Sequence, residues 1–404
     1  MAASDINNVA YIVKRLYNDR EPENLASRRR LWLTKVPKQG DFVGESLTVP
    51  IKIGNPMNIS TTLAGAQASA AGNTAGRKWV ATRVLRYGDV VVDGPSILAT
   101  GNNKGAFVEL LEQEINGTLD EHGRRLSNDL YGNGSGSLGK VSAVAAGVIT
   151  LVNADDAKNF GLGQTIGANP TETGAPGSMR AGQGTISAIN EDGSQITYTG
   201  TITAIAAGDF LYNANASATD YDFGFKGLAA HVPLVAPVGG DSFFQVDRSV
   251  DVNRLAGWRL NQLGYSIEEN AYQLGVRIMR AGGVPDLGLI SPSNFVKLVL
   301  SLGTKVEYTG GSTTAEVGFQ YVTLQLPSGP CKMYADPDAP SDRFYLLQTD
   351  TWKVRFLGNG FPHIIMDDSL RMLRMATLDA IELRTRSIAQ LLCTAPGYNG
   401  VAAC

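Results

Sequence analysis

Residues 104–139 read KGAFVELLEQEINGTLDEHGRRLSNDLYGNGSGSLG, and this stretch decides the fold. Its apolar positions recur every three or four residues, so they form one stripe along a helix, interrupted by a single histidine. The stripe consists of Phe107, Leu111, Ile115, Leu119, His122, Leu126 and Leu130. Its roughly 24 positions span about 36 Å at about 1.5 Å per residue. We therefore expect a long spine helix that ends at the following glycines and serines and along which other parts of the chain are laid.

Composition bounds the class of protein. A chain of 404 residues suggests two or three domains, and its 46 glycines indicate many loops and turns. The net charge of −3 gives no support for a chain that binds nucleic acid with its whole surface, so any such contact is local. There is no apolar run of membrane-spanning length and no signal peptide. Cys331, Cys393 and Cys404 fit no metal or redox motif, so we expect free thiols in a reducing cytoplasm, with Cys404 exposed at the terminus.

The first 95 residues are predicted to be an arm followed by a hairpin. Residues 1–46 carry a net charge of +2, with the basic residues concentrated at Arg28, Arg29 and Arg30. This run is either a solvated charge cluster, a partner for acidic groups on a neighbouring subunit, or a contact to packaged DNA. Residues 47–53 and 80–93 are expected to be strands, joined by a polar tip at 58–76 that cannot form its own core. Such a hairpin is not stable alone and needs a partner surface.

Two further regions follow the spine helix. Residues 140–221 contain short β-type runs separated by turn signals, and beyond Lys140 they hold seven acidic and two basic residues, a net charge of −5. We expect a small acidic β domain here. From Lys226 the pattern is mixed α/β: Ser266 and Glu269 form a capping box before a helix that Gly282 and Gly283 end, and Ser291-Pro292 starts another. Strands and turns then alternate toward the C-terminus.

The candidate chemical motifs do not make an active site. Gly134, Gly136, Gly139 and Lys140 have the spacing of phosphate-binding loops, but those loops follow a strand and precede a helix, and here the order is reversed. The histidines are far apart and have no metal-binding spacing. Asp367 and Asp368 are adjacent, so a turn is favoured over a catalytic dyad. We predict no catalytic residue, no cofactor and no metal, and hence no enzyme.

The predicted elements follow in a fixed order: arm, hairpin, spine helix with its LYGNGSG ending, α/β region, and a strand-rich return that ends in Cys-x-x-Pro. This order resembles that of the major capsid proteins of tailed phages of the Hong Kong 97 (HK97) type. The resemblance implies an α+β fold with named parts. They are an N-terminal arm (1–46), an extended E-loop (47–95), the spine helix of the peripheral P-domain (96–139), an inserted β-rich domain (140–225), an axial A-domain (226–345), P-domain return strands (346–391) and a C-terminal segment (392–404).

The same resemblance implies function and partners. Members of this family self-assemble into hexamers and pentamers of an icosahedral shell around double-stranded DNA. We therefore expect this chain to bind copies of itself and to contact DNA non-specifically. Scaffolding, portal and decoration proteins are possible further partners, and no membrane is expected. Assembly would take place in the host bacterial cytoplasm and the product would be the virion. Intersubunit contact candidates are Arg28, Arg29, Arg30, Lys78, Trp79 and Asn359; Lys78 and Asn359 are nominated because some relatives join a lysine and an asparagine covalently. The alternatives are an encapsulin-like compartment shell and, from residues 140–221, a carbohydrate-binding or adhesion module.

Overall fold

A computed structural model gives the fold of the chain. It describes residues 30–54, 59–68, 75–95, 104–172, 179–214, 221–262, 264–302, 321–358, 360–366, 373–375 and 377–404. None of the helices in these ranges is both long enough and apolar enough to cross a membrane.

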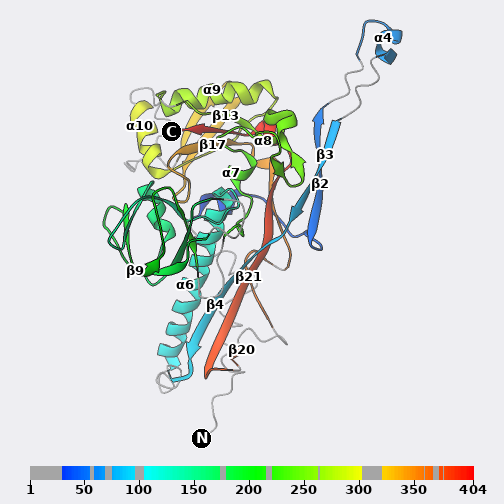
Figure 1. Cartoon of the computed structure of the whole chain (residues 1–404). Coiled ribbons are helices and arrows are strands. Elements are labelled where there is room, and N and C mark those ends of the chain that lie inside the picture. The colour runs from blue at the N-terminus through cyan, green and yellow to red at the C-terminus, as the bar shows by residue number, and fades with distance from the viewer. Residues whose placement is uncertain are drawn as a thin grey trace, which may run out of the picture.

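The predicted spine is present as helix α6, Lys104–Tyr131, which stands along one side of the molecule (Figure 1). The described members of the apolar stripe are buried: Ile115, Leu119, Leu126 and Leu130 are fully covered, and His122 is nearly so. The helix ends where predicted, because Gly134, at φ +95°, adopts a left-handed conformation that favours glycine. Leu111, the other mid-stripe leucine, has a side chain outside the described set.

A long antiparallel ladder lies against the spine helix. Strand β4, Val84–Asp93, pairs over its whole length with β21, Ala380–Cys393. The sheet is completed by β1 (Lys38–Gln39), β18 (Trp352–Phe356), β19 (His363–Ile364) and β20 (Leu373–Arg374). The prediction that residues 80–93 form the second hairpin strand was therefore wrong for most of that strand.

The hairpin itself consists of β2, Ser46–Gly54, and β3, Ala75–Thr82. It reaches out from the body, and a short helix, α4 (Leu63–Ala68), lies at its far end (Figure 1). We predicted a polar tip without a core of its own, and the tip contains this short helix, none of whose residues is buried. The alanines Ala64, Ala66 and Ala68 account for it, since alanine is the strongest helix former.

The acidic β region is a closed six-stranded barrel. Its strands are β5 (Gly139–Ala145), β6 (Val148–Leu151), β7 (Thr165–Asn169), β8 (Gly182–Ile189), β9 (Gln195–Ile202) and β10 (Phe210–Asn213). They pair in the closed order β10-β5-β6-β9-β8-β7 around a core of its own that includes Ile149, Ile166 and Leu211. Closure leaves no free strand edge. The region that we expected to be a β domain thus folds around a core of its own.

The α/β region contains a second six-stranded sheet, ordered β13-β22-β17-β14-β16-β15. The strands are β13 (Trp258–Leu260), β14 (Leu287–Ile290), β15 (Val322–Leu326), β16 (Gly329–Ala335), β17 (Arg343–Leu347) and β22 (Gly400–Ala403). One face is covered by α9 (Ile267–Arg280) and α10 (Pro292–Leu302). The predicted capping box of Ser266 and Glu269 is formed, and Gly282 follows the helix at φ +87°.

The other face of this sheet joins the two halves of the molecule. Its residues Leu289, Tyr345 and Val401 share one core with Leu126 and Leu130 of the spine helix. Helix α3, Leu31–Lys35, inserts Trp32 and Leu33 into the same core. Smaller elements on this side are α7 (Leu228–His231), α8 (Val252–Ala256), β11 (Ser242–Phe243) and β12 (Val246–Asp247).

The three cysteines are unpaired, as predicted. Cys331 and Cys393 are buried. The expectation that Cys404 is exposed was wrong, because its backbone N–H donates to the Asp342 carbonyl at the end of β22 and the side chain is half-buried.

Candidate assembly surfaces

The base of the hairpin is fixed to the body by an aromatic anchor, which we define as Trp79, His231, Phe243 and Phe244. The Trp79 ring centroid lies 5.4 Å from that of His231 and 5.5 Å from that of Phe243. The Val80 amide also donates to the Phe244 carbonyl at 3.2 Å, so the turn between β11 and β12 is hydrogen-bonded to β3. Burial of several aromatic rings makes this the rigid end of the hairpin.

His231 is the polar member of the aromatic anchor, and its side chain is fully buried. Its Nε2 atom lies 3.0 Å from the Leu391 carbonyl oxygen, so the neutral ring donates a hydrogen bond to β21. Burial lowers the pKa of His231 to about 3, and this outweighs the raising effect of that hydrogen bond. The anchor is therefore uncharged at neutral pH.

Trp79 was predicted to contact a neighbouring subunit, and the structure corrects this. Its side chain has no exposed surface, because alternation along β3 turns it toward the aromatic anchor. Lys78, the preceding residue, points the other way and is exposed on the hairpin. Asn359, proposed with it for a covalent link, lies outside the described residues, as do Arg28 and Arg29.

The far end of the hairpin presents apolar side chains to solvent. Ile59 is 91% exposed and Leu63, at the start of α4, is 76% exposed. These are among the most exposed large apolar side chains of the described residues, and they lie at the point of the chain that reaches furthest from the body (Figure 1). An exposed apolar group on a projecting element is typical of a surface that another chain covers.

Arg30 stands where the N-terminal arm meets the body. Its guanidinium donates to the Asp338 carboxylate at 2.9 Å, and only 12% of its side chain is exposed. Two residues later, the Trp32 amide donates to Asp336, which also accepts a hydrogen bond from the Tyr131 hydroxyl at 2.8 Å. Arg30 is thus used within its own chain, where it pairs with Asp338 and, at 3.5 Å, with Asp120 of the spine helix. Its predicted intersubunit role stays a prediction.

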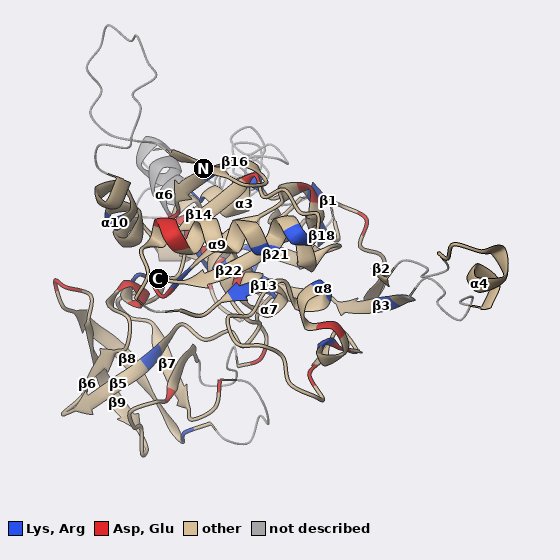
Figure 2. Cartoon of the chain, turned by 90° about the horizontal axis from the view of Figure 1, so that it is seen from above, with Lys and Arg blue, Asp and Glu red and all other residues tan. Residues whose placement is uncertain are grey.

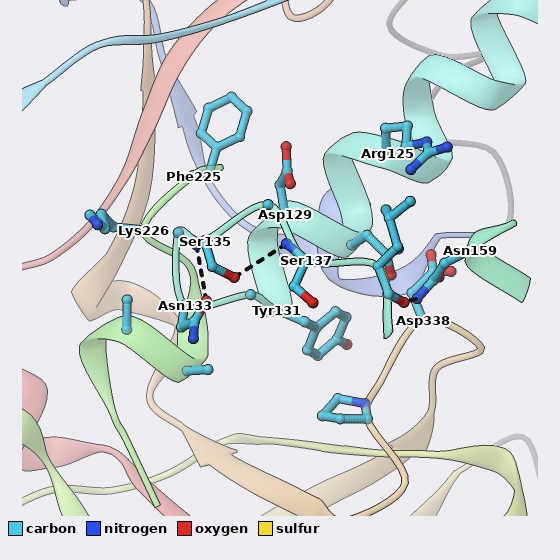
Figure 3. Close-up of a pocket in the computed structure, with 18 of the residues that line it drawn as sticks. Arg125, Asp129, Tyr131, Asn133, Ser135, Ser137, Asn159, Phe225, Lys226 and Asp338 are labelled. Atoms are coloured by element: carbon cyan, nitrogen blue, oxygen red, sulfur yellow. Dashed lines mark hydrogen bonds between the residues drawn. The ribbon is translucent and has the colours of Figure 1, made fainter. Parts of the chain in front are cut away.

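The glycine-rich loop after the spine lines a cleft of about 1610 Å³ between the barrel and the body (Figure 3). The loop's own side chains occupy its amides: Ser135 N–H donates to Asn133 at 3.0 Å and Ser137 N–H to Ser135 at 3.2 Å. Lys226 packs against Gly134, where a Cβ atom would meet its side chain at 2.6 Å. The loop therefore closes the helix, and the Leu138 amide joins it to the barrel by donating to the Leu211 carbonyl at 2.8 Å.

Three comparisons bear on this geometry. A solved capsid structure of cyanophage A-1(L) has a TM-score of 0.50 and 13% sequence identity, over 92% of this chain and 91% of that one. The chain has a phage capsid fold. Two further structures are similar: an SrpI encapsulin from Synechococcus elongatus (TM-score 0.44, 9% identity, 100% and 96% coverage) and one of Mycobacterium phage Adephagia (0.41, 11%, 100% and 97%). No family model matches the sequence, and no curated protein matches it.

His122 is, after His231, a second buried histidine in the body of the chain. Within the described part of the chain, no three His, Cys, Asp or Glu side chains gather as metal ligands. His122 lies between the spine and β21, with Nε2 at 3.0 Å from Ser387 Oγ, and burial lowers its pKa to about 4. The aromatic anchor was not predicted from the sequence. The adjacent residues Phe243 and Phe244, which follow the isolated His231 along the chain, were the available indication.

Proposed function

We propose that this chain is a major capsid protein that self-assembles into hexamers and pentamers of an icosahedral shell enclosing phage double-stranded DNA. The observation that carries the proposal is the projecting hairpin, whose base is locked by the aromatic anchor while its tip exposes Ile59 and Leu63. A two-stranded ribbon is marginal in water without a surface to cover it. In a shell, that surface belongs to the next subunit, so the hairpin is the E-loop. The role is mechanical, and we propose no enzymatic activity.

The domain assignment follows from the same proposal. The α6, β4 and β21 layer is the P-domain, and the sheet with α9 and α10 is the A-domain. The barrel is an insertion between them. Contacts to the body support a fixed position for the barrel: Arg124 donates to the Lys158 carbonyl, and Ser293 donates to Asp155 at 3.4 Å.

The two sides of the molecule differ in a way that suggests inside and outside. Seen from above the A-domain, α3 and β16 lie along one side and the barrel projects from the opposite side (Figure 2). Residues 141–221 carry −5, and packaged DNA is a dense polyanion that would repel them. We infer that the barrel faces outward, where decoration proteins or host surfaces would reach it, and that the arm side faces the DNA. Scaffolding and portal proteins would be further partners during assembly in the host cytoplasm.

Microscopy of the purified full-length protein tests the proposal. We expect closed shells, and deletion of residues 58–76 should leave a folded chain that forms none. Shells that contain nuclease-resistant DNA would support the phage capsid, whereas shells filled with a single enzyme would favour an encapsulin-like compartment. A small soluble oligomer that binds glycans and never forms shells would instead support an adhesion module.

A further inference from the structure

Two lysines and two tyrosines form a basic aromatic patch on the α/β sheet, which we define as Lys35, Lys332, Tyr321 and Tyr334. The Lys35 Nζ atom lies 4.7 Å from the centroid of the Tyr334 ring, and the Lys332 Nζ atom lies 5.1 Å from that of Tyr321. The two rings lie 5.2 Å apart at an interplanar angle of 41°. Each ammonium group is thus placed over a ring face, which attracts a cation electrostatically.

The backbone places these four side chains together. Strands β15 and β16 pair in antiparallel register, with Val322 opposite Met333 and Thr323 opposite Lys332. The same register sets Tyr321 beside Tyr334, and alternation keeps both tyrosines and Lys332 on one face of the sheet. Lys35 comes from the last turn of α3, which is held in place by Trp32 and Leu33 in the core. The patch is therefore preformed.

The charge of the patch is not neutralised within the chain. Arg30, Arg86 and Arg248 each form an ion pair with an aspartate. In the described part of the chain, no carboxylate lies within 4 Å of the ammonium group of Lys35 or Lys332. Asp286, which precedes the strand beside Lys332, accepts a hydrogen bond from the Thr349 amide at 2.7 Å. The patch therefore presents two exposed cations that are held by rings instead of by acids.

The patch lies on the arm side of the molecule. Its two lysines and Tyr334 belong to α3 and β16, which Figure 2 shows on the side opposite the barrel. We propose that the basic aromatic patch binds the phosphate backbone of duplex nucleic acid enclosed by the shell. This assignment rests on the proposed shell function, because it is the shell that gives this side an enclosed polyanion. Since the ammonium groups cover ring faces, the tyrosines position charge and do not stack on bases, and contact is independent of sequence.

The test measures how binding of a short mixed-sequence DNA duplex by the full-length protein depends on salt. The variant combines Lys35→Gln with Lys332→Gln. Each phosphate contact adds about 0.9 to the slope of log affinity against log salt concentration, so losing two contacts should lower the slope by about 1.8. The matched control combines Lys140→Gln, whose ammonium lies 5.0 Å from the Phe210 ring centroid on the barrel, with Lys297→Gln on α10. The control removes the same charge from elsewhere and should keep the slope.

The outcomes separate this inference from the proposed function. An unchanged slope in the patch variant, an equal fall in the control, or tighter binding of a single strand than of the duplex would overturn the inference. Shell formation is scored independently by microscopy of the same preparations. If the patch variant forms normal shells and keeps the salt slope of the unaltered protein, the inference alone is rejected. If the unaltered protein forms no shells, the proposed function is rejected.

Discussion

Charge introduced at the tip of the hairpin should abolish assembly without unfolding the subunit. The variant combines Ile59→Asp with Leu63→Asp. Both side chains are exposed in the single chain, so an aspartate there meets water and disturbs no core. In a shell, the same positions would be covered by a neighbour, and each buried carboxylate would lack a partner.

The size of the effect follows from the area that the tip offers. Fully burying an isoleucine or leucine side chain contributes about 1.5–3 kcal/mol. Scaled by exposed fractions of 91% and 76%, the two side chains together offer about 2.5–5 kcal/mol per hairpin. At about 1.4 kcal/mol per tenfold change in affinity, loss of this burial weakens the contact by roughly two to four powers of ten. The cost of burying the new charges adds to this.

Light scattering against protein concentration gives the threshold for assembly, and circular dichroism gives the melting temperature of the unassembled chain. We expect a threshold at least about a hundredfold higher and an unchanged melting temperature. Leu162→Asp is the control, since Leu162 is 72% exposed but lies on the barrel. An unchanged threshold in the tip variant, or an equal rise with Leu162→Asp, would refute the role assigned to the hairpin.

Three other predictions concern the spine, pH and the barrel. Leu119→Ala empties a fully buried site and should lower the free energy of unfolding by about 2–5 kcal/mol in denaturant titrations, whereas Glu114→Ala, at an exposed site, should change it little. The free energy of unfolding should fall as pH drops from about 6.5 to about 4, because His122 takes up a proton in the unfolded state but stays neutral when buried in the folded state. His122→Gln should remove roughly 3 kcal/mol of this pH dependence and leave the part that comes from His231. An identical pH profile in the variant would contradict the burial of a neutral His122 ring. A glutamate-specific protease should cut intact DNA-filled particles at Glu191, in the exposed turn between β8 and β9, before it cuts the arm; the reverse order would place the barrel inside.

Much of the fold was predictable where a signal is local. The spine helix follows from one apolar stripe, and the capping box fixed the start of α9 to the residue, because both depend on side chains a few positions apart. The barrel was predictable as a β-rich unit from its turns, but not as a closed barrel. Closure depends on β10 pairing with both β5 and β7, and those contacts leave no trace in either strand's own pattern.

The pairing of β4 was the main error, and its cause is distance along the chain. Val84–Asp93 was assigned to the nearer strand because hairpins join neighbours, whereas its actual partner, Ala380–Cys393, lies almost 300 residues away. The burial of β4 alternates, with Val90 and Val92 buried and Val91 exposed, which suits a strand with one face on the spine helix. A strand of a free ribbon has no reason to bury one face so regularly. The sequence does not reveal this alternation, because positions 90–92 are all valine and only the structure shows which of them are buried.

Two of the candidate contact residues, Trp79 and Arg30, are used inside the chain, and this sharpens the account of assembly. Arg30 was nominated within the basic run of Arg28 to Arg30, as a possible partner for acidic groups on a neighbouring subunit, and Trp79 was nominated beside Lys78 on the hairpin. Both are held within the chain, Trp79 by the aromatic anchor and Arg30 by Asp338. A hairpin that swung freely at its base would have to dock and order at once, at a large cost in entropy. With the base already fixed, a neighbour has only the tip left to order, so the residues that determine the contact are the modest apolar side chains at the far end.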